Sequence, residues 1–148
     1  MEGLIKEDPN RYIGTIRKIQ AFSILPYGEL RNVISQMRSF HFEAGTTIIN
    51  QREAANMFFI VHRGMVEVSV KPYFFKRKQV TVLKPGDFFG ESALVSNSRR
   101  NATVKALTDT YCFVLLKPSF KHVIQESPLF REIMKTVSTR RRRELKNA

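Results

Sequence analysis

The sequence predicts a mainly β fold with flanking helices. Short segments rich in β-branched and aromatic residues fill the middle of the chain. The turn sequences EAG, HRG and KPGD separate these segments, while helical spacing of apolar residues occurs only toward the two ends. Many short strands of this kind are typical of a sandwich or a barrel.

Residues 1–40 are expected to form short helices that cover the core. Ile13, Ile16 and Ile19 recur at helical spacing, and Pro26 interrupts the pattern. A second apolar stripe follows the proline and consists of Leu30, Val33, Ile34 and Met37. Its i, i+3, i+4, i+7 spacing predicts an amphipathic helix.

Residues 41–116 are expected to form the β region. The strand-like segments are TTIIN (46–50), MFFIVH (57–62), MVEVSV (65–70), QVTVLK (79–84), NATVKAL (101–107) and TYCFVLL (110–116). The chain has 148 residues, of which 43% are hydrophobic, and this is enough apolar material for one core. Because no low-complexity linker divides the sequence, we expect one domain over residues 1–148.

Residues 117–148 are expected to be helical. Ser127 and Pro128 form a helix start, with a capping hydroxyl followed by proline at the first helical position. The apolar face of this helix carries Phe130, Ile133, Met134 and Val137. Because the rest of the helix is highly charged, we expect it to act as a movable lid; the alternative is a permanently docked terminal helix. The four arginines at 140–143 suit a solvated helix end, and contact with a partner or an acidic surface is the alternative.

Composition limits the classes of function. Lys and Arg exceed Asp and Glu by 25 − 13 = 12, which favours anionic partners such as nucleic acid, acidic membrane or a phosphorylated ligand. The sequence contains neither an apolar run long enough for a transmembrane segment nor a signal-peptide pattern, so a cytoplasmic setting is expected. The only cysteine, Cys112, is expected to be a buried hydrophobe. The three histidines are scattered, and GESAL lacks the second glycine of a nucleophile elbow, so we expect no metal site and no enzyme.

One stretch, PGDFFGESALVSNSRRNATV at residues 85–104, combines the groups that a nucleotide needs. Gly90 and the following turn can bring backbone N–H groups close to a phosphate, and Arg99 or Arg100 can supply a bidentate cation. Glu91 would repel a phosphate, but it can accept a hydrogen bond from a ribose hydroxyl. The alternative is a surface turn with a Glu–Arg ion pair.

The same residues carry a resemblance to a known family. PGDFFGESALVSNSRRNATVKA resembles the phosphate-binding cassette of the cyclic nucleotide-binding domain family, whose pattern is F-G-E-x-A-L, a short loop and R-x-A-T-V. GTTIINQREAANMFFIVHRGMVEV resembles the first strands of the family, with Gly45 and Gly64 at its turn glycines. The resemblance implies a β-roll, a double-stranded β-helix of jelly-roll type, with N-terminal helices and a C-terminal lid helix.

The resemblance also implies roles for single residues. Glu91 would accept from the ribose 2′-OH, and Arg100 would bind the cyclic phosphate, while Arg99 would point to solvent. The expected ligand-binding set is Gly90, Glu91, Ser92, Ala93, Arg100, Asn101, Val82, Leu83 and Val104, the last three at the base pocket. Gln51-Arg52-Glu53 departs from the family's Q-G-D/E turn, at a place expected to be distant from the cassette.

The resulting hypothesis is a non-catalytic cAMP sensor whose last helix becomes ordered on binding. Asn101 leaves the choice between cAMP and cGMP open, and we favour cAMP. No cofactor other than this ligand is expected, the effector protein is unknown, and no DNA-binding domain is visible. The alternatives are a basic nucleic-acid-binding protein that uses the segment PYFFKRK, and a domain that has kept the fold but lost its ligand.

Overall fold

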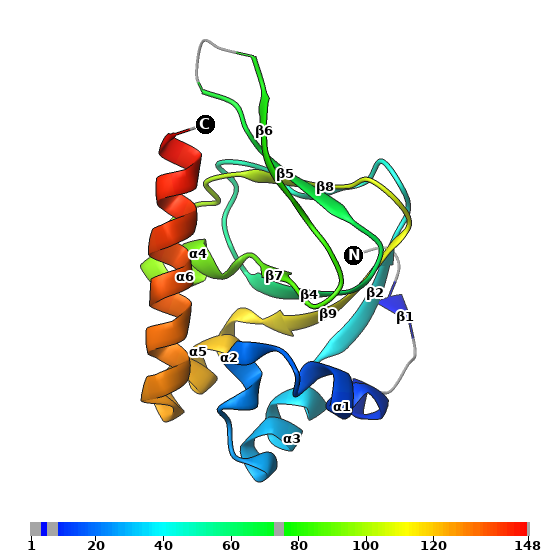
Figure 1. Cartoon of the computed structure of the whole chain (residues 1–148), viewed down its shortest axis with the longest axis vertical. Helices are drawn as coiled ribbons and strands as arrows, with labels where there is room; N and C mark the ends of the chain where they lie inside the picture. The colour runs from blue at the N-terminus through cyan, green and yellow to red at the C-terminus, as the bar shows by residue number, and fades with distance from the viewer. Residues whose placement is uncertain (1–3, 6–8, 73–75, 148) are drawn as a thin grey trace.

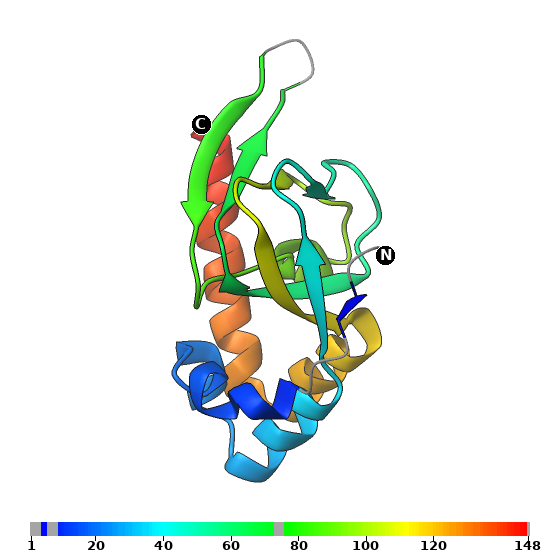
Figure 2. The ribbon, with the colours of Figure 1, turned by 90° about the vertical axis from the view of Figure 1, so that its right-hand side faces the viewer.

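The computed structural model describes residues 4–5, 9–72 and 76–147 and contains two antiparallel sheets. The first sheet has the order β1 (Leu4–Ile5), β2 (Arg38–Phe42), β9 (Thr110–Leu116), β4 (Met57–Arg63) and β7 (Phe88–Phe89). The second has the order β3 (Thr47–Ile49), β8 (Thr103–Ala106), β5 (Val66–Val70) and β6 (Lys78–Leu83). The sheets face each other as a β-roll, with helices against one side and one end (Figures 1 and 2). The predicted class, mainly β with flanking helices, is confirmed.

The central parts of β4 and β9 are apolar on both faces, because both faces are buried. In β4, Phe58 and Ile60 pack into the core beneath the helices, whereas Phe59 and Val61 point into the interior of the roll. β9 pairs with β4 and divides its side chains in the same way. Alternation of polar and apolar residues is expected only where one face of a sheet meets water, so its absence here follows from the two cores. Burial also raises the pKa of the Cys112 thiol to about 12, as expected for a buried cysteine.

The sheets begin earlier than expected. β2 starts at Arg38 and β1 lies at residues 4–5, so the boundary placed at residue 40 was wrong. Along β2, Arg38 is exposed, Ser39 is buried and His41 is partly buried. Phe40 and Phe42 alternate with Ser39 and His41, so the strand pattern is present in the sequence but short.

The helices gather around the first sheet. Before β2 lie η1 (Pro9–Tyr12), α1 (Ile13–Ile16), α2 (Gln20–Ser23) and α3 (Tyr27–Ser35), and after β9 lie α5 (Lys117–Glu126) and α6 (Pro128–Lys146). The backbone of Ile19 is extended, with ψ of 124°, so the isoleucine stripe is divided between separate short helices. Ser127 caps α6 by accepting a hydrogen bond from the backbone N–H of Phe130, which confirms the predicted start. Among the described residues, no helix has the length and apolar composition needed to cross a membrane.

α6 runs along one side of the roll, with α4 (Glu91–Ser96) against it (Figure 1). The first half of α6 belongs to the core, because Phe130 and Met134 are fully buried. The ring of Phe130 meets the ring of Phe22 edge-on, at 5.3 Å between centroids. This half of the helix is therefore docked, in contrast to the lid expected from the sequence.

Candidate functional site

A cavity of about 70 Å³ lies between the second sheet, α4 and the end of α6. Its lining includes all of the predicted ligand-binding residues except Val82: Leu83, Gly90, Glu91, Ser92, Ala93, Arg100, Asn101 and Val104. On β6, Val80, Thr81 and Leu83 line the cavity, and Val82 does not. Val82, which was expected at the base pocket, is thus not part of the lining of this cavity.

Gly90 allows the backbone to approach Arg100 closely. Its φ of +89° lies in the left-handed region that favours glycine. A Cβ at this position would lie 3.1 Å from both Nη1 of Arg100 and the carbonyl oxygen of Met57. Any larger residue would therefore push the guanidinium away from the start of α4.

Arg100 is buried and holds two parts of the chain together. Its Nη1 donates to the carbonyl oxygen of Gly90 at 2.7 Å, and its Nη2 donates to that of Met57 at 2.6 Å. Burial lowers the pKa of Arg100 to about 10, partly opposed by the charge of Glu91, so the guanidinium is still protonated at pH 7. These two bonds use two of the five donors of a guanidinium, which leaves others for an anion.

The turn at residues 51–53 forms two backbone hydrogen bonds with Arg100. Arg52 donates its backbone N–H to the carbonyl oxygen of Arg100 at 2.7 Å, and Arg100 donates its own to Glu53 at 2.8 Å. Arg52 has φ of +76°, so this arginine adopts the conformation for which the family commonly uses glycine. The expectation that this turn is distant from the cassette was wrong. Arg99 is exposed and donates through Nη1 to the carbonyl oxygen of Arg52 at 3.1 Å.

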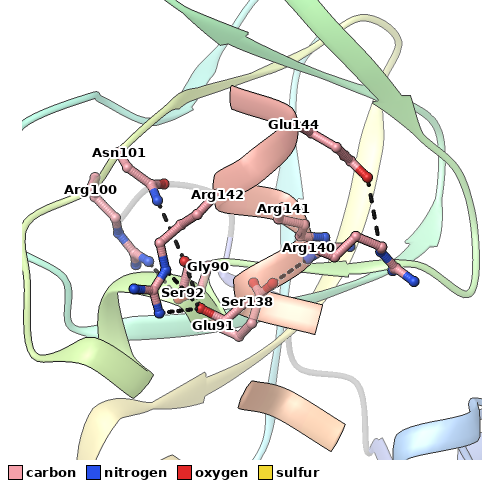
Figure 3. A network of polar contacts seen from close by, with 10 residues as sticks. All are labelled: Gly90, Glu91, Ser92, Arg100, Asn101, Ser138, Arg140, Arg141, Arg142 and Glu144. Carbon is pink, nitrogen blue, oxygen red and sulfur yellow. Dashed lines mark hydrogen bonds and ion pairs between the residues drawn. The ribbon is translucent and has the colours of Figure 1, made fainter. Parts of the chain in front are cut away.

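Glu91 forms an ion pair with Arg141, which was expected to be solvated. The Glu91 side chain is only 2% exposed, and its Oε1 accepts from Nη1 of Arg141 at 2.6 Å (Figure 3). The Arg141 guanidinium also lies over the ring of Phe88, 5.0 Å from its centroid. The prediction of a fully solvated arginine run was therefore wrong for Arg141.

A signal for this contact was present in the spacing of the helix. Phe130, Met134, Ser138, Arg141 and Leu145 follow one another at intervals of three or four residues, so they share one face of α6. The apolar stripe that ends at Val137 is thus continued by a polar one. None of the four predicted lid residues lines the cavity; α6 contributes Arg141, Glu144 and Leu145 instead.

Buried hydroxyl groups join the cassette to α6. The hydroxyl groups of Ser92 and Ser138 share a hydrogen bond of 2.9 Å, and Ser138 is fully buried. Arg142 donates through Nη2 to the Ser138 hydroxyl at 2.8 Å, and Asn101 donates through Nδ2 to the Ser92 hydroxyl at 3.4 Å (Figure 3). These contacts fix the position of α6 against α4 one turn before Arg141. Within the described ranges, no three His, Cys, Asp or Glu side chains cluster as metal ligands would.

Known proteins resemble both the sequence and the fold. The chain is 33% identical over 113 residues to the cAMP-dependent protein kinase regulatory subunit of Yarrowia lipolytica, covering 76% of this chain and 29% of that protein. It is 32% identical over 104 residues to the cGMP-dependent protein kinase of Plasmodium berghei, covering 70% of this chain and 12% of that protein. The chain thus spans less than a third of either relative.

The solved structures include the regulatory domain of Toxoplasma gondii PKA with cAMP. It shares the fold with a TM-score of 0.82 at 23% identity, covering 89% of this chain and 50% of that one. The profile of the cyclic nucleotide-binding domain family matches residues 39–127, which contain the cassette and the strands around it. The chain therefore belongs to the cyclic nucleotide-binding domain family.

Proposed function

We propose that this chain binds a cyclic nucleotide, cAMP in the first place, as a non-catalytic regulatory module. The observation that carries the proposal is that a buried carboxylate and a buried guanidinium line the same cavity. Glu91 and Arg100 come from the same cassette, and both line that cavity together with the apolar side chains of Ile49, Val68 and Val104. An anionic phosphate, a hydroxyl-bearing sugar and an apolar base match this combination of groups.

In this proposal Arg100 binds the cyclic phosphate with the donors that Gly90 and Met57 do not use. A buried cation loses hydration, and an anion restores favourable electrostatic interactions to it. Glu91 accepts a hydrogen bond from the ribose 2′-OH, and the backbone around Ser92 and Ala93 approaches the phosphate. The base lies against the apolar wall of the second sheet.

The ligands and the class of effector that we propose follow from the names of the relatives. One relative is cAMP-dependent and the other cGMP-dependent, and Asn101, which lines the cavity, can bond to either purine. Both are parts of protein kinase systems, so a protein kinase is the class of effector that we propose. We further propose that any change of order in α6 on binding is confined to the part after Val137, because Phe130 and Met134 are core residues.

Calorimetric titration at two salt concentrations tests the proposal against nucleic-acid binding. A cyclic nucleotide carries a single charge, so we expect cAMP affinity to change little between 50 and 200 mM salt. A protein that contacts 6–10 phosphates loses about 10³–10⁵ in affinity over that range. Absence of cAMP and cGMP binding, with tight and steeply salt-dependent binding of an oligonucleotide, would reject the proposal.

The role of Glu91 is tested by combining a substitution with a change of ligand. We expect Glu91→Gln to weaken cAMP binding less than Arg100→Ala does. We also expect the Glu91→Gln variant and the parent protein to bind 2′-deoxy-cAMP about equally. Each change removes one partner of the same hydrogen bond, so the two losses are not additive. The exposed Glu53→Gln serves as the control for loss of one charge. Simple additivity would show that Glu91 does not bind the ribose.

A further inference from the structure

The hairpin of β5 and β6 and the last turns of α6 together carry a dense group of exposed cations. Figures 1 and 2 both show the end of α6 beside this hairpin, and Val80 of β6 lines the same cavity as Leu145 of α6. We call the exposed basic side chains of these two segments the cationic end; its members are Lys71, Lys76, Arg77, Lys78, Arg142, Arg143 and Lys146. Residues 73–75, which complete the segment PYFFKRK, lie outside the described part of the chain and are not members.

The cationic end lacks acidic partners. Residues 71–78 contain no acidic residue, and residues 139–147 contain only Glu144. The Glu144 carboxylate pairs with Arg140, at 3.9 Å between Oε1 and Nε, and Arg140 is not a member. Within the described part of the chain, no member of the cationic end forms an ion pair.

Two of the members are oriented by neutral groups. Arg77 donates through Nη1 to the Ser69 hydroxyl at 3.0 Å, as Arg142 does through Nη2 to the Ser138 hydroxyl at 2.8 Å. These bonds orient the guanidinium groups and leave their charge uncompensated. Like charges gathered at one end of a molecule repel one another, and an anionic partner offsets this repulsion. The partner that fits the cationic end is therefore a polyanion.

The shape of the cationic end decides between the classes of polyanion. A helix with its side chains is about 10–12 Å across, and the strands of a hairpin lie about 4.8 Å apart. The major groove of duplex DNA is about 12 Å wide, so it can accept the hairpin or α6 but not both side by side. Single-stranded nucleic acid is typically held in a cationic groove, whereas this hairpin extends beyond the roll (Figure 1). A flat surface lets both segments approach together.

We propose that the cationic end binds the surface of a bilayer that contains acidic phospholipids. Lys and Arg clusters beside a membrane are attracted to anionic headgroups, and each cation near the surface strengthens binding about fivefold. The contact is peripheral, because charged side chains stay among the headgroups. The inference does not depend on nucleotide binding, since no member of the cationic end lines the cavity at Glu91 and Arg100.

Vesicle co-sedimentation tests the proposal with two triple variants, each of which loses three positive charges. The hairpin variant is Lys76→Gln/Arg77→Gln/Lys78→Gln. The control is Arg31→Gln/Arg38→Gln/Arg131→Gln, three exposed positions in α3, at the start of β2 and in the first turn of α6, toward the opposite end of the molecule (Figure 1).

We expect the parent protein to bind phosphatidylcholine vesicles only when they also contain phosphatidylserine. The hairpin variant should bind these acidic vesicles on the order of 100-fold more weakly than the parent, and the control should remain within about fivefold. Raising the salt from 0.1 M to 1 M shortens the Debye length from about 10 Å to about 3 Å and should release the protein. Absence of binding by the parent, or equal losses in the two variants, would overturn the proposal.

A second pair of variants tests the part of the surface that α6 provides. Arg143→Gln/Lys146→Gln changes the cationic end, and Arg131→Gln/Lys135→Gln removes the same two residue types from exposed positions in the first half of the helix. We expect the first variant to bind acidic vesicles on the order of 25-fold more weakly than the parent, and the second to remain within about twofold. Equal binding by these two variants would overturn a surface shared by the hairpin and α6.

Competition with duplex DNA separates the two polyanions. We expect duplex DNA, at a phosphate concentration equal to that of the lipid, to leave the protein on the acidic vesicles. Release of the protein by the DNA would assign the cationic end to nucleic acid and overturn the proposal. Calorimetric titration of the hairpin variant with cAMP should match that of the parent, because the hairpin cations do not line the cavity. Vesicle binding by protein that binds no cyclic nucleotide would support the cationic end while the proposed function fails.

Discussion

Replacement of Arg100 by alanine is expected to weaken cAMP binding about 30-fold or more, whereas Arg99→Ala should leave the affinity within about twofold. Removing one partner of a buried, hydrogen-bonded charge pair costs about 2–5 kcal/mol, and 1.4 kcal/mol corresponds to a factor of ten. Arg99 is exposed and donates to the carbonyl oxygen of Arg52, so its contribution is small. Titration calorimetry of both variants measures the difference directly.

The Arg100 variant needs a folding control, because this side chain also supports the structure. Its loss leaves the carbonyl oxygens of Gly90 and Met57 without their donor, at a cost of about 1–3 kcal/mol for each buried group left unsatisfied. Denaturant unfolding of the same sample shows whether the β-roll is intact at the temperature of the titration. Folded Arg100→Ala protein that loses no more affinity than Arg99→Ala would show that Arg100 does not bind the phosphate.

The sequence was informative where local chemistry decides the structure. The strands around Phe59 and Val114 were predictable because runs of β-branched and aromatic residues are extended whether one face or both are buried. Gly90 and Arg100 lie ten positions apart along the chain, and one short helix and one loop bring them into contact, so their proximity could be anticipated from the cassette. The start of α6 was equally local, since Ser127 caps it through a bond to Phe130.

The contacts that were missed join distant segments. Arg141 is separated from Glu91 by 50 positions, and its neighbours in the sequence are arginines that give no hint of which one turns inward. Arg52 stands where the family commonly has glycine, and its turn was expected to lie far from the cassette. Its backbone nevertheless takes the left-handed conformation, and its N–H donates to the carbonyl oxygen of Arg100, 48 positions away in the sequence. Such contacts depend on how α6 and the strands pack, which spacing along one segment does not determine.

The same limitation explains the lid prediction, which rested on the charged face of α6. A narrow apolar stripe is enough to dock a helix if the partner surface is also apolar, and here α2, α5 and the first sheet provide that surface. Phe22 and Phe120 contact the Phe130 ring from two separate segments. The stripe therefore specifies core packing, and the contacts of α6 with the cassette lie further along the helix.

Phe130→Ala is accordingly expected to lower the free energy of unfolding by about 3–5 kcal/mol, the usual cost of removing a phenyl ring from a core. The Phe130 side chain is fully buried, and the cavity left behind would lie between the rings of Phe22 and Phe120. Leu129→Ala is the matched control, because the neighbouring leucine is 65% exposed and its loss should change stability by no more than about 0.5 kcal/mol. Denaturant titration of both variants, with equal slopes, gives the two values. If Phe130→Ala unfolded at the same denaturant concentration as the parent and only bound cAMP more weakly, α6 would be a detachable lid along its whole length, and its first half would not belong to the core.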